Sequence, residues 1–371
     1  MSGTAAHKPE APHKTGSQIR VMIVDDSATI RGFLARWVDS DPALKVVASA
    51  NNGRVALDQV KAADPDVIIL DIEMPEMDGI TALPHLLKAS PHSKIIMASA
   101  LTRLNAEISL KALSLGATDY VPKPTSLAGG EAGEMFRREL CAKIVAVARP
   151  RAGARKLGAQ LAAATPHAAG AIKLRAASMV TPQIVAIGSS TGGPQALVRV
   201  VTALAPQLEV PVVITQHMPA TFTAILAETL QRNSGLKCVE GAEGMKLQPG
   251  CVYVAPGDNH MVIKGRGGPI ALLQTPPENF CRPAVDPMFR SVAAAYGPAT
   301  LAVVLTGMGT DGREGARAVA GAGGTILAQD EASSVVWGMP AAVAHAGLAS
   351  AVLPLESVAG EVRKYLGLKR R

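Results

Sequence analysis

Two stretches of this chain alternate short, wholly apolar runs with segments of helical periodicity. In residues 19–137 the apolar runs lie at 19–24, 44–50, 67–70, 95–98 and 119–121. In residues 181–371 they lie at 184–187, 210–215, 300–305 and 323–327, and hairpin-like strands at 251–255, 261–264 and 270–273 are predicted to be inserted between them. Apolar strands that alternate with helices are typical of parallel sheets covered on both faces. We predict an α/β chain with two doubly wound parallel-sheet domains.

The segment between these blocks, residues 138–180, has a different composition. It holds eight basic residues and one acidic residue, a net charge of +7 that equals the excess of the whole chain. Its first part, 138–148, also has the pattern of an extension of the last helix. The remainder is rich in Ala, Gly and Pro and predicts a basic, solvated linker. Residues 1–18 are polar and predict a disordered tail.

Composition excludes several classes of protein. The four cysteines lie far apart without a C-x-x-C pair, which argues against a disulfide framework or zinc finger and fits a reducing compartment. Five Phe, two Trp and four Tyr provide little surface for stacking on single-stranded nucleic acid. Because the chain has neither the apolar core of a signal peptide nor a run of about 20 apolar residues, we expect a cytoplasmic protein without membrane insertion.

Acidic residues stand where predicted strands of the first block end. Asp25 and Asp26 follow the first strand, and Asp71 follows the third. Ligands bind at this edge of open α/β sheets, and clustered carboxylates need a cation, with Mg²⁺ the natural choice. Ser99 ends the fourth strand and Lys123 follows the fifth, so the five positions predict a phosphoryl acceptor. One such Asp alone is more often a solvated turn residue.

A glycine-rich turn follows the first strand of the second block. Gly188, Ser190 and Gly192 match the pattern G-x-S-x-G, in which a sharp strand-to-helix turn exposes a serine. The following helix would offer free N–H groups to an oxyanion. Turns of this kind also cradle phosphates, so the motif alone leaves both interpretations open.

A histidine and an aspartate favour the catalytic interpretation. His217 and Asp311 each lie just past a predicted strand end, as Ser190 does. A nucleophilic serine needs a base, and the base needs an acid that orients it. The order Ser, His, Asp differs from the Ser, Asp, His order of α/β-hydrolases, which argues against that fold. A lone histidine is more often structural, and a lone aspartate in a glycine-rich loop is usually a turn residue.

Residues 19–137 resemble response-regulator receiver domains, which have a flavodoxin-like fold. The motifs are Val24-Asp25-Asp26-Ser27, Leu70-Asp71-Ile72-Glu73-Met74-Pro75, Met77-Asp78-Gly79, Ser99-Ala100 and Lys123-Pro124. The resemblance implies that Asp71 is phosphorylated and that Asp25, Asp26 and the Glu73 carbonyl help to hold Mg²⁺. It also implies that Ser99 and Tyr120 are switch residues and that Lys123 contacts the phosphate.

Residues 181–371 resemble the catalytic domain of the chemotaxis protein-glutamate methylesterases, the CheB family, with a Rossmann-like fold. The motifs are 186–194, Thr215-Gln216-His217-Met218-Pro219, Ala255-Pro256-Gly257, Arg282-Pro283-Ala284-Val285-Asp286 and 306–312. With the receiver and linker in this order, the resemblance covers nearly the whole chain.

The second resemblance implies a role for each matching residue. Ser190 would be the nucleophile, His217 the base and Asp311 its orienting partner. Thr191 and Met308 match positions that supply oxyanion N–H groups, and Arg282 is a weaker candidate for substrate contact. The chain departs from the family pattern at Ser189, where many members have Ala, at Ala284, where Ser is usual, and at Thr310, a variable position.

The two resemblances together imply a regulated hydrolase. The enzyme would demethylate glutamate γ-methyl esters on chemoreceptors and deamidate certain glutamines, with no cofactor for the hydrolysis. A histidine kinase would phosphorylate Asp71 and loosen a receiver that otherwise blocks the esterase cleft. A fragment of residues 181–371 is then expected to be more active than the unphosphorylated chain, and we expect a monomer.

Three other functions could use parts of this sequence. A receiver coupled to DNA binding rests only on the basic segment, and we expect no nucleic-acid partner. A catalytically silent adapter is disfavoured because all three members of the trio are present. A serine hydrolase that acts on another protein ester or amide remains open.

Overall fold

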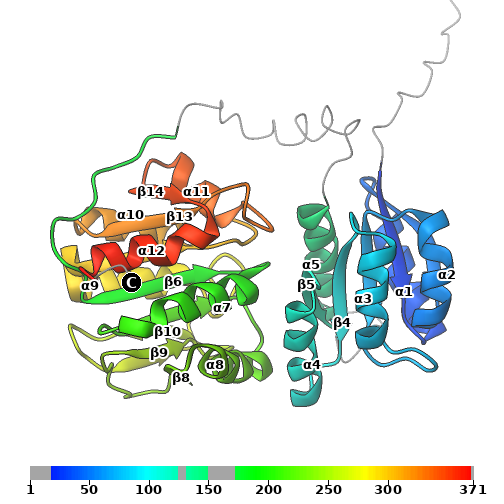
Figure 1. Cartoon of the computed structure of the whole chain (residues 1–371), viewed down its shortest axis with the longest axis horizontal. Coiled ribbons are helices and arrows are strands. Elements are labelled where there is room, and N and C mark those ends of the chain that lie inside the picture. The colour runs from blue at the N-terminus through cyan, green and yellow to red at the C-terminus, as the bar shows by residue number, and fades with distance from the viewer. Residues whose placement is uncertain (1–17, 124–130, 149–171, 369–371) are drawn as a thin grey trace, which may run out of the picture.

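The computed structural model describes residues 18–123, 131–148 and 172–368. Nearly all of the predicted tail and most of the predicted linker therefore lie outside the described residues. The described residues form two α/β domains, which lie side by side in Figure 1. None of the helices in the described ranges is long and apolar enough to cross a lipid bilayer.

The first domain is a five-stranded parallel sheet with the order β2-β1-β3-β4-β5, which is the flavodoxin-like order. Its elements are β1 (Ile19–Val24), α1 (Ala28–Asp39), β2 (Leu44–Ala50), α2 (Gly53–Ala63), β3 (Val67–Asp71), α3 (Gly79–Ala89), β4 (Lys94–Ser99), α4 (Arg103–Ser114), β5 (Asp119–Pro122) and α5 (Glu131–Val147). Every residue of β3 is buried, because helices cover both faces of the sheet.

Polar caps begin four of the five helices of this domain. The side chains of Ser27, Asn52, Asp78 and Thr102 each accept a hydrogen bond from a backbone N–H in the first turn of α1, α2, α3 and α4. Such caps satisfy N–H groups that have no partner within the helix. They fix where each helix begins after the loop that follows its strand, on the side of the sheet where the acidic residues lie.

The second domain has a seven-stranded parallel sheet with the order β14-β13-β12-β6-β7-β9-β8 and a separate antiparallel hairpin of β10 and β11. Its elements are β6 (Ile184–Ser189), α7 (Gly193–Leu204), η2 (Ala205–Gln207), β7 (Val212–Gln216), α8 (Ala220–Ser234), β8 (Lys237–Glu240), β9 (Cys251–Val254), β10 (His260–Ile263), β11 (Ile270–Leu273), α9 (Val285–Tyr296), η3 (Gly297–Ala299), β12 (Thr300–Val304), α10 (Arg313–Gly321), β13 (Thr325–Gln329), α11 (Met339–His345), β14 (Ala351–Leu353) and α12 (Leu355–Tyr365).

The doubly wound parallel sheets are confirmed, but one predicted strand has a different place. The run 251–255 was expected in the inserted hairpin, whereas β9 lies in the main sheet, parallel to β7 and β8. The physical reason is that all four residues of β9 are buried between neighbouring strands. Only β10 and β11 form the inserted hairpin. A short apolar run does not reveal the direction of its partner.

Helix α5 continues past the boundary expected at residue 137. Leu140, Cys141, Ile144 and Val147 are buried in the apolar core of the first domain, so this part of the basic segment belongs to that domain. At the other end, Arg175 donates hydrogen bonds to the carbonyls of Gly324 and Ala320 in the second domain. The described part of 138–180 is thus attached at both ends.

The two domains meet mainly through α4 and β5 of the first and α7 and α8 of the second, and Val336 packs against the core that includes α5. The rings of Tyr120 and Phe222 are stacked, with centroids 4.6 Å apart and planes 9° from parallel. Beside them, Arg103 Nη2 lies 2.8 Å from Glu228 Oε1, and Gln195 Nε2 donates to the Ala117 carbonyl at 3.0 Å. Figure 1 shows α4 and α5 on the side of the first domain that faces the second.

Candidate functional site

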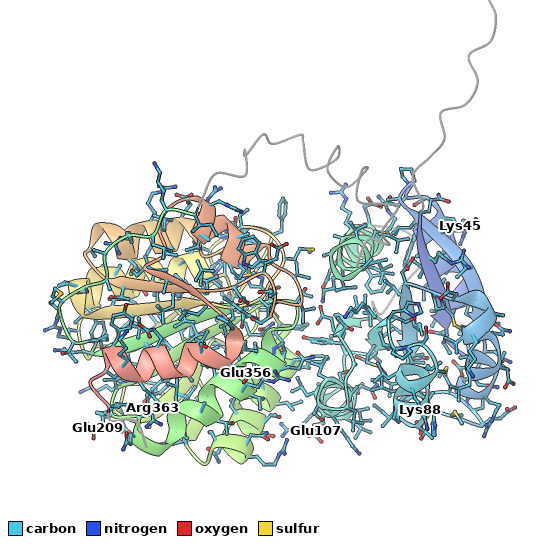
Figure 2. The ribbon with its side chains drawn as sticks, turned by 45° about the horizontal axis from the view of Figure 1, so that its top comes forward. Lys45, Lys88, Glu107, Glu209, Glu356 and Arg363 are labelled. Carbon is cyan, nitrogen blue, oxygen red and sulfur yellow. The ribbon has the colours of Figure 1, made fainter. Side chains whose placement is uncertain are left out.

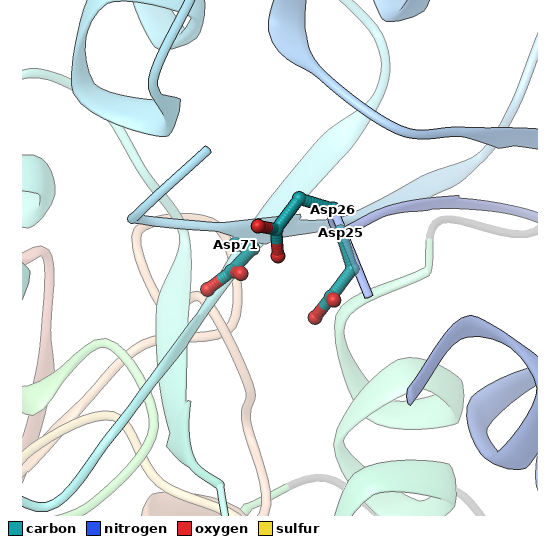
Figure 3. Close-up of side chains that lie close together, drawn as sticks. All are labelled: Asp25, Asp26 and Asp71. Carbon is teal, nitrogen blue, oxygen red and sulfur yellow. The ribbon is translucent and has the colours of Figure 1, made fainter. Parts of the chain in front are cut away.

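Three carboxylates gather at the carboxyl edge of the first sheet. Asp25, Asp26 and Asp71 each offer an oxygen within 4.8 Å of the others. Figure 3 shows the three side chains close together. Asp25 and Asp71 are buried, while Asp26 is exposed. Burial raises the pKa of Asp71 to about 6, although Lys123 works in the opposite direction. Carboxylate oxygens at this spacing are the ligands that Mg²⁺ prefers, so the donor set fits a hard divalent cation.

Lys123 joins the carboxylates from the end of β5. Its Nζ lies 2.6 Å from Asp25 Oδ2 and 2.7 Å from Asp71 Oδ1. The ammonium thus partly neutralises two acidic groups and occupies the position from which it could contact a phosphate on Asp71. The side chain of Glu73 is exposed to solvent near this cluster.

The other two sequence-predicted positions of this domain connect the acidic cluster to the domain interface. Ser99 is buried, and its Oγ accepts a hydrogen bond of 3.0 Å from Ser109 of α4. Tyr120 is buried against Phe222 of α8, and burial raises the pKa of its hydroxyl above the ordinary value. A shift of Ser99 toward Asp71 would therefore disturb α4, which packs on the second domain.

In the second domain, Ser190 stands at the topological switch point of the sheet. It follows β6, which lies between β7 and β12, and the crevice at such a point is the usual binding site in open α/β sheets. Gly192 has a φ angle of 74°, which permits the sharp turn into α7. A Cβ on Gly307 would lie 2.9 Å from Ser190 Cβ, so the glycine makes room for the serine.

Ser189 and Ser190 have different environments. Ser189 is fully buried, and its Oγ donates to Gln216 Oε1 at 2.7 Å. Ser190 is half-buried, and within the described residues its Oγ has no hydrogen-bond partner. The free hydroxyl of Ser190 is therefore the one that can react with a ligand.

His217 and Asp311 form a close pair beside this serine. The His217 N–H donates to the carbonyl of Ser189 at 3.2 Å, which places the residue just past the paired ends of β6 and β7. Its ring Nε2 lies 2.7 Å from Asp311 Oδ2. The structure thus brings the three predicted strand-end residues to one edge of the sheet.

Asp311 is held by many donors. It accepts from the backbone N–H groups of Val285 and Asp286 at the start of α9, from that of Gly312, and from Asn279 Nδ2. Burial alone would raise its pKa, but these donors and His217 lower it below the ordinary value. The carboxylate is thus kept charged and fixed in orientation, as an acid that orients a base must be.

Cys281 contacts the other side of the imidazole. Its Sγ lies 3.4 Å from His217 Nδ1, whereas no hydrogen bond joins His217 to Ser190 among the described residues. Burial disfavours the charged ring, but Cys281 and Asp311 outweigh it and raise the pKa of His217 well above its ordinary value. In this arrangement the Cys281 thiol contacts Nδ1, which is the ring nitrogen that must face Ser190 if His217 is to act as its base.

The remaining site residues predicted for the second domain are Thr191, Met308 and Arg282. Within the described residues, the backbone N–H groups of Thr191 and Met308 have no hydrogen-bond partner, so both are free to bind an oxyanion. Arg282 Nη1 donates to the carbonyls of Gln274 and Thr275, and among the described residues no hydrogen bond or ion pair joins Arg282 to His217 or Asp311.

Comparison with known proteins identifies both domains. Residues 185–362 match the CheB methylesterase family, and residues 21–129 match the response regulator receiver domain. The protein-glutamate methylesterase/protein-glutamine glutaminase 1 of Paramagnetospirillum magneticum is 51% identical, over 96% of this chain and 98% of its own. The chain belongs to the CheB methylesterase family. The methylesterase/glutaminase of Azospirillum brasilense is 50% identical, over 96% of each chain.

Among solved structures, the CheB catalytic domain of Thermotoga maritima is 41% identical, with a TM-score of 0.48, over 50% of this chain and 99% of that one. The CheB relationship, predicted from sequence motifs, is confirmed by the two family matches and by the full-length relatives. Asn279, Cys281 and Asp286 were not predicted as site residues. Asp286 and Cys281 lie in or beside the Arg282–Asp286 motif, whereas nothing in the local sequence marks Asn279.

Proposed function

We propose that this chain is a response-regulator methylesterase that acts in chemotaxis adaptation. It hydrolyses glutamate γ-methyl esters on chemoreceptors, deamidates certain receptor glutamines, and receives phosphate from a histidine kinase. The observation that carries this proposal is the His217–Asp311 pair, with Nε2 and Oδ2 2.7 Å apart beside the free hydroxyl of Ser190, in a CheB chain. Release of methanol from methylated receptors tests it.

The mechanism is an acyl transfer. Ser190 Oγ attacks the γ-carbonyl of the methylated glutamate while His217 removes its proton and Asp311 stabilises the charged imidazole. The N–H groups of Thr191 and Met308 bind the oxyanion. The intermediate collapses with loss of methanol, and water then attacks the acyl-enzyme to give glutamate. A glutamine follows the same route with ammonia as the leaving group. Arg282 remains a candidate for substrate contact.

The contacts of the described residues support domain bounds that differ from those expected from composition. We place the end of the receiver after α5, near residue 148, and the start of the esterase near residue 172, with the segment between them as the linker. Asp71 is the proposed site of phosphorylation, and Asp25, Asp26 and the Glu73 carbonyl would hold Mg²⁺. When bound, this ion would neutralise the charge that develops on the transferred phosphoryl group.

Chelation is expected to abolish phosphorylation of the receiver. With acetyl phosphate as phosphodonor, the chain should incorporate phosphate in Mg²⁺ and incorporate none in excess EDTA, because Asp71 is buried next to Asp25. Phosphorylation is followed by intact mass, and Asp71→Asn serves as the unmodified control. Equal incorporation with and without the ion would contradict the metal assignment.

Regulation rests on the interface between the domains. The receiver packs on α7 and α8, and these helices begin three residues after Ser190 and His217, respectively. In addition, Val336, which lies beside the Met308 turn, packs against the core of the receiver that includes α5. A receiver at this position restricts access to the catalytic edge. Phosphate on Asp71 would draw Ser99 and Lys123 toward it and repack the surface around Tyr120 and α4.

A charge swap across this interface tests the regulation. Arg103→Glu sets a carboxylate against Glu228, so the unphosphorylated rate should rise roughly two- to fivefold. Glu107, labelled in Figure 2, lies 3.4 Å from Arg103 and adds to the repulsion. The double variant Arg103→Glu, Glu228→Arg should return toward the wild-type rate. Initial rates of methanol release measure both, and no change in the single variant would refute the model of a blocking receiver.

The pH dependence of the esterase should respond to Cys281. A protonated His217 cannot act as a base, so the rate should rise with pH as the ring loses its proton. Cys281→Ala removes a group that raises the pKa of His217, so the rising limb of the kcat/KM profile should move to lower pH. Cys238→Ala, which is remote from the site, is the control. Identical profiles for both variants would show that the thiol does not govern the base.

A further inference from the structure

A tight turn at residues 278–281 lies against the catalytic acid and base. Glu278 and Cys281 exchange two backbone hydrogen bonds, of 3.1 and 2.9 Å. The two residues between them have positive φ angles, 52° at Asn279 and 64° at Phe280. This is the pattern of a type I′ turn, in which Asn and Gly are favoured. Asn279 suits the turn, whereas an aromatic residue at the next position is unfavourable.

The other three side chains of the turn hold it in place. Asn279 Nδ2 donates to Asp286 and to Asp311, both at 3.0 Å. Cys281 contacts His217, and Glu278 accepts a hydrogen bond of 2.6 Å from Arg290. The turn is therefore fixed with respect to the reacting groups.

Phe280 is the one residue of the turn without such a role. Its side chain is 99% exposed, although the receiver is packed on the same domain. The ring contributes almost nothing to the packing of the described residues, and its backbone conformation is unfavourable for its residue type. A large apolar group that is rigidly presented to solvent beside a catalytic site is suited to contact a partner.

We propose that Phe280 is a substrate-docking residue, whose ring packs on apolar side chains of the receptor segment that carries the methylated glutamate. The inference rests on the proposed function. The scissile ester must reach Ser190 and His217, and Cys281, the neighbour of Phe280, touches His217, so the polypeptide that bears the ester passes over this turn. The charge of Glu278 is paired with Arg290, so the group that the turn presents to the substrate is the apolar ring of Phe280. The receiver is not the occupant, since it leaves the ring exposed.

The test compares two substrates of the full-length chain, a methylated receptor and a small N-acetylglutamate γ-methyl ester. For Phe280→Ala, the ratio of kcat/KM on the receptor to kcat/KM on the small ester should fall about tenfold, through a higher KM for the receptor. Met179→Ala is the matched control, because Met179 is also 99% exposed but follows Ser178, which contacts Thr325 at the opposite edge of the sheet. Its ratio should equal that of the wild type.

A glycine variant separates docking from stability. Glycine adopts positive φ without strain, so Phe280→Gly should unfold at the same or a higher temperature than the wild type while its ratio falls as far as that of the alanine variant. Phe280→Tyr should retain the wild-type ratio. Unchanged ratios in the alanine and glycine variants, with an active wild type, would overturn the docking role alone. A wild type that releases no methanol from the receptor would overturn the proposed function, and the docking role with it.

Discussion

Replacing Ser190 by alanine should lower the rate of methanol release by a factor on the order of 10⁶. The loss is expected because the acyl-enzyme cannot form without the Ser190 hydroxyl that attacks the ester. Single-turnover assays on methylated receptor with excess enzyme give the rate, and circular dichroism verifies that the variant is folded.

Two neighbouring residues supply the controls for this variant. Ser189→Ala removes the hydroxyl that donates to Gln216 and leaves that buried oxygen without a partner, so it should lower stability by about 1–3 kcal/mol and retain activity. Cys281→Ala should also retain esterase activity. If Ser190→Ala stayed active while Cys281→Ala lost activity, the thiol would be the nucleophile and the serine assignment would be wrong.

Replacing Asp311 by asparagine should reduce kcat by about 10⁴-fold. The amide can preserve the shape of the site, but it no longer stabilises the imidazolium that forms when Ser190 loses its proton. It also places an NH₂ or a neutral oxygen against His217 Nε2, which disturbs the tautomer of the ring. The measurement is the pre-steady-state rate at saturating substrate, with thermal unfolding as a test of folding.

Asp286→Asn is the informative comparison for this second variant. Burial and the nearby charge of Asp311 raise the pKa of Asp286 to about 6, and it accepts from Gly315 and Asn279 without touching His217. Its replacement relieves repulsion between two carboxylates and should have a much smaller effect on kcat. Equal losses for the two variants would mean that Asp311 acts only through the shape of the network.

The parallel architecture and the place of the main reactive residues follow from the sequence pattern. Wholly apolar strands that alternate with helices predict parallel sheets, and residues after such strands must meet at one edge. For this reason Asp25, Asp71, Ser190 and His217 were all expected close to their observed neighbours. Asp311 could be predicted in the same way, although a loop of six residues separates it from β12.

The remaining features depend on tertiary contacts that no local pattern reveals. Asn279 and Cys281 reach the catalytic pair because a turn outside the main sheet folds back on it. The direction of β9 is decided by its neighbours β7 and β8, which lie on both sides of it. The end of α5 was obscured because basic residues on its solvent side resemble those of the linker, while its apolar side is buried.

The stacked rings of Tyr120 and Phe222 have a thermodynamic consequence. Separation of the domains exposes both rings to water, so the closed arrangement is favoured until another interaction offsets that loss. If phosphate on Asp71 favours the separated state and the receptor also binds that state, the two ligands are linked, and linkage is reciprocal. If phosphorylation raises the affinity for the receptor by a certain factor, a receptor bound in the cleft must shift the phosphorylation equilibrium of Asp71 by the same factor. The substrate itself therefore takes part in activating its enzyme.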